Sequence, residues 1–177
     1  MFKCIAAATL AVVTTAVAAP AFAASSSEPF GPVTGYVNLG YSYVDLDPGF
    51  HVLDGRVGAR VGKYVGVEGE VGFGVGSQSV SGVSVKVKST YNGYAVGFIP
   101  LAPNADLFGR VGYGHSNISG SASGTTLTLG EDSLNFGGGG QYFFTAKDGF
   151  RAEYTRYDFR HGNGAANVYS VSYVRRF

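Results

Sequence analysis

The sequence contains no tryptophan and a single cysteine, Cys4, and only 14 % of its 177 residues are charged. About a quarter of the residues in an ordinary soluble domain are Asp, Glu, Lys or Arg, so this chain has little charge for a solvated surface. Beyond residue 24, no stretch approaches the roughly 20 apolar residues of a membrane helix. These two shortages disfavour both an ordinary soluble domain and a helical membrane protein.

Glycine and aromatic residues are abundant, with 28 Gly, 12 Tyr and 13 Phe. A glycine in a helix interior costs about 1 kcal/mol relative to alanine, which disfavours a helical bundle. The glycines follow no three-residue period, which excludes collagen, and the aromatic content argues against a disordered chain. An all-β protein with an apolar exterior remains.

The first 23 residues have the three parts of an export signal. Lys3 provides the positive start, residues 5–19 are apolar, and Ala21-Phe22-Ala23 has the small-residue pattern of a cleavage site. Pro20 interrupts the apolar run where a signal peptide should end, which disfavours the alternative of a membrane anchor. We therefore predict a signal peptide over residues 1–23 and a polar leader over residues 24–32.

The exported chain would have neither a cysteine nor an excess of one charge. Cys4 falls within the predicted signal, so no disulfide or thiol chemistry is expected. Removal of Lys3 reduces the 13 basic residues to 12, which equals the number of acidic residues. A chain with balanced charge has no excess of basic residues to bind phosphates, so we expect no nucleic-acid partner.

Beyond residue 32 the sequence alternates between apolar residues and small or polar ones, which is the period of a β-strand. In one such stretch, Leu39 and Tyr41 lie on the opposite face from Asn38 and Gly40. The pattern predicts eight strands, at 35–44, 53–62, 65–75, 83–99, 107–115, 133–144, 150–159 and 168–177.

The polar faces carry Gly, Ser, Asn and isolated charges, unlike the solvated face of a sandwich. Small residues suit the interior of a narrow barrel, and aromatic residues near strand ends suit the interfacial girdles of a membrane barrel. Because no sheet edge can stay unpaired in hydrocarbon, the strands must close. We predict an all-β fold over residues 33–177, an eight-stranded antiparallel transmembrane β-barrel with up-and-down meander topology. A lipocalin-like soluble barrel, the alternative, would place the aromatic face inside.

The predicted connections fall into a short set and a longer, more polar set. Membrane barrels have short periplasmic turns and longer extracellular loops. We therefore predict periplasmic turns near residues 63–64, 100–105 and 147–149, and outer loops at 45–51, 76–82, 116–132 and 161–167, of which 116–132 is the longest.

Two segments fit the alternation badly. The apolar residues of 83–99 change face partway, which predicts either a bulge near Asn92-Gly93 or a projection of 83–89 above the membrane. Arg156 would point at lipid, which costs about 2–4 kcal/mol at the membrane midplane. We therefore expect a bulge at Arg156, or a position for it at the outer headgroups.

Several features together resemble the small outer-membrane β-barrel family of Gram-negative bacteria, which includes OmpA-type domains and OmpX- and Opa-like barrels. They are the signal peptide, the strand 35–43, the Pro-Leu-Ala-Pro-Asn-Ala-Asp-Leu turn at 100–107 and the alternating C-terminus. The resemblance implies the outer membrane as the location, with lipid and lipopolysaccharide as partners. It also implies a C-terminal signal for the barrel-assembly machinery, matched by Tyr169, Val171, Tyr173 and Phe177, whereas Arg175 departs from that pattern.

Charged residues fall mostly on the predicted inward face, where unpaired charges are costly and should pair across strands. We predict an interior network centred on Arg60, Glu68, Glu70, Arg110 and Glu153 and filling the barrel. A gate in a narrow pore is the alternative. The predicted network comprises Arg56, Arg60, Glu68, Glu70, Arg110, Arg151 and Glu153, and Lys86, Lys88 and Arg176 are predicted to face inward with it.

Histidine, serine and acidic residues near the outer rim are candidates for two kinds of site. Some eight-stranded barrels modify lipid A with His and Ser, but His115 and Ser116 are consecutive and should face opposite ways. His161 has no serine at the hydrolase spacing. Acidic residues of the outer loops could bind divalent cations that bridge lipopolysaccharide; these are Asp45, Asp47, Glu131 and Asp132.

The sequence thus predicts a structural or surface-interaction role, through membrane integrity or loop-mediated contact with host or phage ligands. It predicts no enzyme activity and no cofactor. The alternatives are a narrow passive channel and, after it, a lipid A-modifying enzyme.

Overall fold

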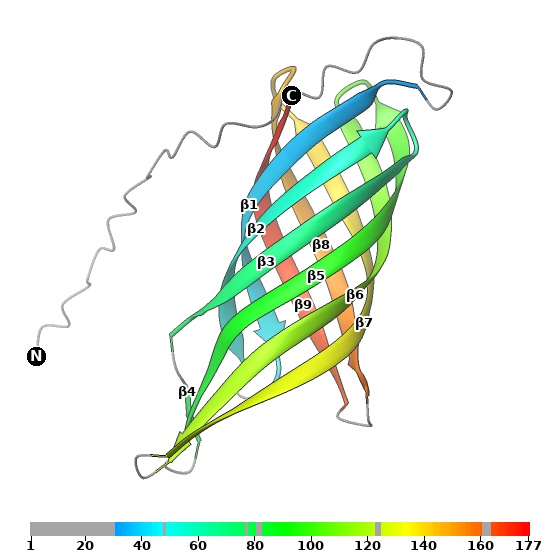
Figure 1. Ribbon diagram of the computed structural model, residues 1–177. Helices are drawn as coiled ribbons and strands as arrows, with labels where there is room; N and C mark the ends of the chain where they lie inside the picture. The colour runs from blue at the N-terminus through cyan, green and yellow to red at the C-terminus, as the bar shows by residue number, and fades with distance from the viewer. Residues whose placement is uncertain (1–30, 48, 77, 81–82, 123–124, 161–163) are drawn as a thin grey trace, which may run out of the picture.

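The computed structural model describes residues 31–47, 49–76, 78–80, 83–122, 125–160 and 164–177, which form a tilted antiparallel barrel (Figure 1). The predicted signal peptide and most of the predicted leader lie outside the described residues. Within the described ranges, no helix is long and apolar enough to cross a membrane. The strands are β1 (Val33–Asp45), β2 (Phe50–Val61), β3 (Val65–Val75), β4 (Gln78–Val80), β5 (Val83–Ala102), β6 (Ala105–Ala122), β7 (Thr125–Phe143), β8 (Asp148–Phe159) and β9 (Ala165–Arg176).

Eight of these strands make a closed wall. Neighbours in the order β3-β2-β1-β9-β8-β7-β6-β5 are hydrogen-bonded, and pairing of β3 with β5 closes the ring. β4, three residues long, pairs with the part of β5 that extends beyond β3. Every pairing is antiparallel, and apart from the closing pairs each wall strand follows its neighbour in the chain. The predicted eight-stranded antiparallel barrel with up-and-down topology is therefore confirmed.

The alternation along each strand separates two faces. On β3, Val67 and Val71 are 60 % and 42 % exposed, whereas Glu68 and Glu70 are 4 % and 6 % exposed. The apolar side chains of most strands thus face outward, as a membrane barrel requires. The lipocalin-like alternative, which places the apolar face inside, is wrong.

The interior is not uniformly polar. A buried apolar layer, the aromatic layer, lies below the charged side chains at the end where the chain enters β1. Its members are Tyr36, Tyr94, Val96, Phe98, Phe108, Phe143 and Val174. A smaller cluster of Tyr157, Ala166 and Val168 lies near the opposite end, against Val44 and Phe159. The interior is therefore layered along its length.

Tight turns join the strands at one end, here called the short-turn end. They cover residues 62–64, 103–104 and 144–147, close to the short connections that the sequence predicts. At the first, Gly62 has a φ of +62°, which favours glycine, and its N–H donates to the Pro32 carbonyl at 3.0 Å. This bond ties the start of the barrel to the β2–β3 turn.

The predicted loop over 116–132 is wrong. Residues 105–122 and 125–143 form β6 and β7, which stay paired from Ala105 and Tyr142 to Ala122 and Thr125. The strands contain 18 and 19 residues, whereas about 9–11 suffice to span a membrane. Together with the far end of β5 they project beyond the rest of the wall (Figure 1). The alternating run Thr126-Leu127-Thr128-Leu129 was the local signal for this extension.

The change of face in the fourth predicted strand has a different origin from the predicted bulge. Pairing is regular through Asn92 and Gly93, and the register shift lies between Val87 and Ser89. Tyr94, Val96 and Phe98, which carry the second apolar parity of this strand, belong to the aromatic layer and face inward. β3 pairs with β5 only from Thr90 onward, so residues 83–89 belong to the projection.

Arg156 faces outward, as strict alternation requires, and β8 pairs with both neighbours without a register shift. Tyr154 is the last outward apolar residue before it, and Asp158 follows on the same face. The bulge expected at Arg156 is therefore wrong, and its position at the outer headgroups stays a prediction. Its Nη1 donates weakly to Asn167 Oδ1, at 3.4 Å.

Inward glycines should tolerate substitution less well than outward ones. A Cβ on Gly139 would lie 2.1 Å from the Ala152 carbonyl oxygen, whereas on outward Gly109 the nearest atom would be 3.9 Å away. We expect Gly139→Ala to lower the free energy of unfolding by about 1–3 kcal/mol through overpacking. Gly109→Ala should change it little. Urea unfolding of both variants in lipid vesicles, followed by gel mobility, would measure the difference; equal losses would contradict the assignment of faces.

Candidate functional site in the barrel interior

Three arginines and three glutamates, here called the charged layer, meet in the middle of the interior. Arg56 comes from β2, Glu68 and Glu70 from β3, Arg110 from β6, and Arg151 and Glu153 from β8. The alternation of each strand points them inward, and each is at most 7 % exposed. These six are the members of the sequence-predicted set that the structure brings together.

Arg56 and Arg110 share two carboxylates. Arg56 donates from Nε to Glu70 Oε2 at 2.9 Å and from Nη2 to Glu153 Oε1 at 2.7 Å. Arg110 Nη1 lies 3.2 Å from Glu70 Oε2, and its Nη2 lies 2.8 Å from Glu153 Oε1. Each carboxylate is thus held between two guanidinium groups from different strands.

Arg151 extends the layer to the third glutamate. Its Nη1 and Nη2 donate to the two oxygens of Glu68, at 2.6 and 3.2 Å, and its Nε donates to Glu153 Oε2 at 2.8 Å. The guanidinium also lies over the Phe108 ring, 3.6 Å from the centroid, in a cation–π contact. Arg151 is fully buried, so its charge depends entirely on these partners.

Neutral groups satisfy the remaining oxygens. Tyr36 Oη donates to Glu68 Oε1 at 2.7 Å, and Asn92 Nδ2 and Tyr157 Oη donate to Glu70 Oε1 at 2.8 and 3.2 Å. Arg110 also donates to Thr155 Oγ1 at 2.7 Å. The sequence analysis did not predict these four residues, although the alternation along their strands indicates that they face inward.

Arg60, predicted as part of the centre, lies elsewhere. It is paired with Asp106 near the short-turn end, with Nη1–Oδ2 and Nη2–Oδ1 distances of 3.0 and 3.1 Å. It follows Arg56 by four residues on β2, so it also faces inward but lies closer to the short-turn end. Asp106 was not predicted, because a partner so distant in sequence leaves no local pattern.

The other predicted inward charges have different positions. Lys88 is exposed, because the register shift beside it lies in the projection. The side chain of Lys86 lies outside the described residues. Arg176 is half-buried at the short-turn end, with its guanidinium 4.1 Å above the centroid of the Phe143 ring.

The outer-rim candidates do not assemble into a catalytic site among the described residues. His115 Nδ1 lies 2.7 Å from Asp132 Oδ1 and is exposed, whereas Ser116 is 5 % exposed on the opposite face. His161 lies outside the described residues. In the part of the chain that the structure covers, no three His, Cys, Asp or Glu side chains are grouped to hold a metal ion, so Asp45, Asp47, Glu131 and Asp132 are not shown to form one.

The C-terminal residues predicted as an assembly signal share the outward face of β9 and its end. Tyr169, Val171 and Tyr173 are 51 %, 62 % and 38 % exposed, and Phe177 is 55 % exposed. The Phe177 N–H donates to the Gly35 carbonyl at 2.9 Å, which fixes the end of the chain beside β1.

Residues 9–177 match the family model described as outer membrane protein beta-barrel domain. No curated protein sequence matches the chain.

Among solved structures, the N-terminal β-barrel domain of Pseudomonas aeruginosa OprF is similar with a TM-score of 0.64 at 14 % identity, over 81 % of this chain and 97 % of that one. Ail, the attachment invasion locus protein of Yersinia pestis, is similar with a TM-score of 0.62 at 17 % identity, over 82 % and 97 %. Neisserial surface protein A has a TM-score of 0.58 at 11 % identity, over 81 % and 95 %. At these identities the likeness shows the fold.

Removal of one member of the charged layer should be costly. We expect Glu68→Ala to lower the free energy of unfolding by about 3–5 kcal/mol, because it leaves Arg151 buried with an incomplete set of partners. The double variant Glu68→Met with Arg151→Met should recover much of that loss. Asp148→Ala breaks the pair with Arg175 at 3.2 Å and the exposed hydrogen bonds that Asp148 accepts from Thr145 and Tyr173, and it should cost only about 1 kcal/mol. Urea unfolding in vesicles would measure all three, and equal losses for Glu68→Ala and Asp148→Ala would contradict the role of the layer.

Proposed function

Because the chain belongs to the outer membrane protein beta-barrel domain family, we propose that it is a non-conducting outer-membrane barrel that presents a rigid β-sheet at the cell surface. The family gives the outer membrane as the location. The role within that membrane is proposed to be structural and surface-interacting, without enzyme activity.

The projection of β5, β6 and β7 carries the surface role. β6 and β7 have 18 and 19 residues, about eight more than a membrane-spanning strand needs. A paired hairpin of that length holds its shape without a ligand, unlike a loop, which loses conformational entropy on binding. Short turns close the opposite end, and membrane barrels typically have their short turns on the periplasmic side, which supports an extracellular position for the projection.

The neighbours in fold support the same class of role. One of the Ail structures is a complex with the heparin analogue sucrose octasulfate. Ail is described as an attachment invasion locus protein, and Neisserial surface protein A is described as a surface protein. By analogy of fold, we propose a host or phage surface ligand for the projection here.

Export and assembly are proposed from the sequence. Residues 1–23 act as the signal peptide, and the outward row of Tyr169, Val171, Tyr173 and Phe177 presents the C-terminal strand to the barrel-assembly machinery. Lipopolysaccharide would surround the outer part of the apolar band, with Arg156 at the level of its headgroups.

The interior supports a plug over the alternative of a narrow channel. Arg56, Arg110 and Glu153 link β2, β6 and β8 across the barrel at distances of 2.7 and 2.8 Å. A charged side chain that leaves this layer loses several short charge-assisted bonds at once, which opposes spontaneous opening.

In planar bilayers, we expect the purified barrel to give no steady current. The double variant Arg56→Ala with Arg110→Ala should open a measurable conductance, because it removes two guanidinium groups that fill the cross-section. Arg156→Ala, on the outward face of β8, serves as the control and should stay silent. A steady current through the unmodified barrel would favour the channel instead.

Shortening the projection should abolish surface binding while the barrel still folds. Asn117 pairs with Gly130, so residues 118–129 can be replaced by a two-residue Asn-Gly turn between them. We expect cells that display the shortened barrel to lose adhesion to epithelial cells and to immobilised sulfated glycans. Heat-dependent gel mobility should be unchanged. Equal adhesion by both forms would contradict the surface role.

A further inference from the structure

The barrel interior contains a fourth acidic side chain beside the charged layer, that of Asp54 on β2. It is 4 % exposed and lies two residues before Arg56 on the same inward face. Its Oδ2 accepts a hydrogen bond from Ser42 Oγ at 2.6 Å. Its Oδ1 is also buried and has no hydrogen-bond partner among the described residues. An ionised carboxylate in this position is costly, because no protein donor replaces the water that Oδ1 has lost.

The arginines of the charged layer are already matched by its glutamates, three against three. Asp54 faces Arg56 from its own strand, Glu70 from β3 and Glu153 from β8. Arg56 Nη2 lies 3.8 Å from Asp54 Oδ1, which is too long for a hydrogen bond. The same Nη2 donates to Glu153 Oε1 at 2.7 Å and also to Glu70 Oε2. A charge on Asp54 would therefore leave this interior group with one negative charge in excess.

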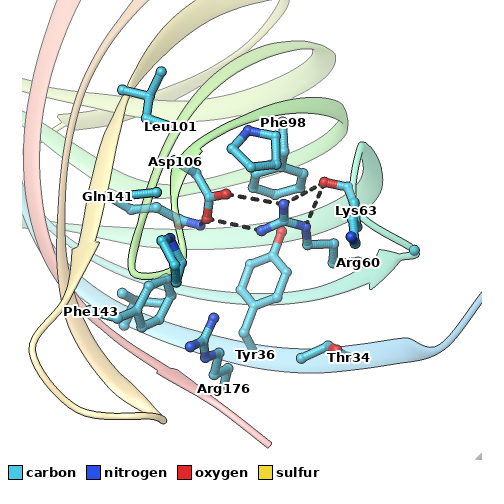
Figure 2. A pocket seen from close by; sticks show the side chains of 15 residues that line it. Thr34, Tyr36, Arg60, Lys63, Phe98, Leu101, Asp106, Gln141, Phe143 and Arg176 are labelled. Carbon is cyan, nitrogen blue, oxygen red and sulfur yellow. Dashed lines mark hydrogen bonds and ion pairs between the residues drawn. The ribbon is translucent and has the colours of Figure 1, made fainter.

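The strands beside Asp54 place no other cation next to it within the described ranges. β1 and β3 present glycines at the paired positions, Gly40 and Gly72. The next inward cation along β2 is Arg60, which is paired with Asp106 toward the short-turn end (Figure 2). The excess charge thus has to be balanced by something other than a basic side chain.

A proton fits this position better than a metal ion. A Cβ on Gly40 would lie 2.7 Å from Asp54 Oδ1 and 2.9 Å from Ser172 Cβ, so Oδ1 lies against the backbone of β1 and beside β9. A metal ion needs several oxygen ligands. In the part of the chain that the structure describes, no three acidic, His or Cys side chains are grouped to hold one. A proton requires only one acceptor for the O–H group that it creates.

Two buried hydroxyl groups provide that acceptor. Ser42 Oγ lies 2.6 Å from Asp54 Oδ2 and 2.6 Å from Ser170 Oγ. Because a hydroxyl group can both donate and accept, the same contacts suit either state of the acid. With a proton on Oδ2, Asp54 donates to Ser42, which donates in turn to Ser170. Oδ1 is then an uncharged carbonyl oxygen, which costs less to leave unpaired than a carboxylate oxygen.

We propose that Asp54 is a proton-binding site inside the barrel, where its carboxyl group keeps a proton at neutral pH and so leaves the charged layer in balance. When alkaline conditions remove that proton, the new charge competes with Glu70 and Glu153 for Arg56. The site makes the interior network sensitive to pH. It depends only on buried contacts, so it stands independently of the proposed surface role.

Infrared spectroscopy of the folded protein in heavy water at neutral pH tests the protonation state. A protonated carboxyl group has a C=O stretch apart from the amide and carboxylate bands. We expect this band in the unmodified protein and its loss in Asp54→Asn, which keeps the shape of the neutral side chain. Asp148→Asn alters the carboxylate paired with Arg175 at the short-turn end and, as the control, should keep the band.

Heat-dependent gel mobility would verify that both variants fold. Absence of the band from the unmodified protein, or its persistence in folded Asp54→Asn, would overturn the proposal.

Urea unfolding in vesicles at several pH values gives an independent measurement. An unfolded aspartate ionises near pH 4, so between about pH 5 and 7 the folded protein would hold one proton more than the unfolded chain. The unfolding equilibrium constant of the unmodified protein should therefore rise by about tenfold per pH unit relative to that of Asp54→Asn. Titrating pairs that both proteins retain, such as His115 with Asp132, cancel in this comparison. Parallel pH profiles for the two proteins would count against a bound proton.

Discussion

The requirement that no strand edge stay unpaired in hydrocarbon governs this structure. It is met where β3 pairs with β5, through eight register pairs between Val65–Gly97 and Gly72–Thr90. Once that ring is closed, each strand has one face toward lipid and one toward a narrow interior. The outward valines and the inward glutamates of β3 are two consequences of the same closure.

Closure of eight strands leaves little space inside, and this explains the distribution of glycine. A Cβ on Gly114 would lie 1.9 Å from Asn92 Oδ1, and one on Gly112 would lie 2.1 Å from the Gly93 carbonyl oxygen. Because these positions have no side chain, Asn92 and Tyr94 fit inside the barrel, where Asn92 Nδ2 donates to Glu70 of the charged layer. Burial of charge is tolerable because the guanidinium groups and glutamates are mutually satisfied. The charged layer and the excess of glycine therefore both follow from the narrow interior of the barrel.

The two ends of the barrel differ in structure. At one end, turns of two to four residues lie beside the buried aromatic layer. At the other, β5, β6 and β7 continue past their neighbours as a paired sheet. The charged layer lies between them.

The sequence by itself determined the barrel class, the inward parity of the arginines and glutamates, and the outward position of Arg156, because each depends on the two-residue period of a strand. It did not determine which residues of strands distant in the sequence contact one another. Arg151 pairs with Glu68 across 83 positions, and Arg60 pairs with Asp106 across 46. The inward turn of Tyr94 and Phe98, and the extension of β6 and β7 through a Ser- and Gly-rich segment, were likewise decided by tertiary packing. Local periodicity reports which residues share a face, but only closure of the barrel decides which residues meet across it.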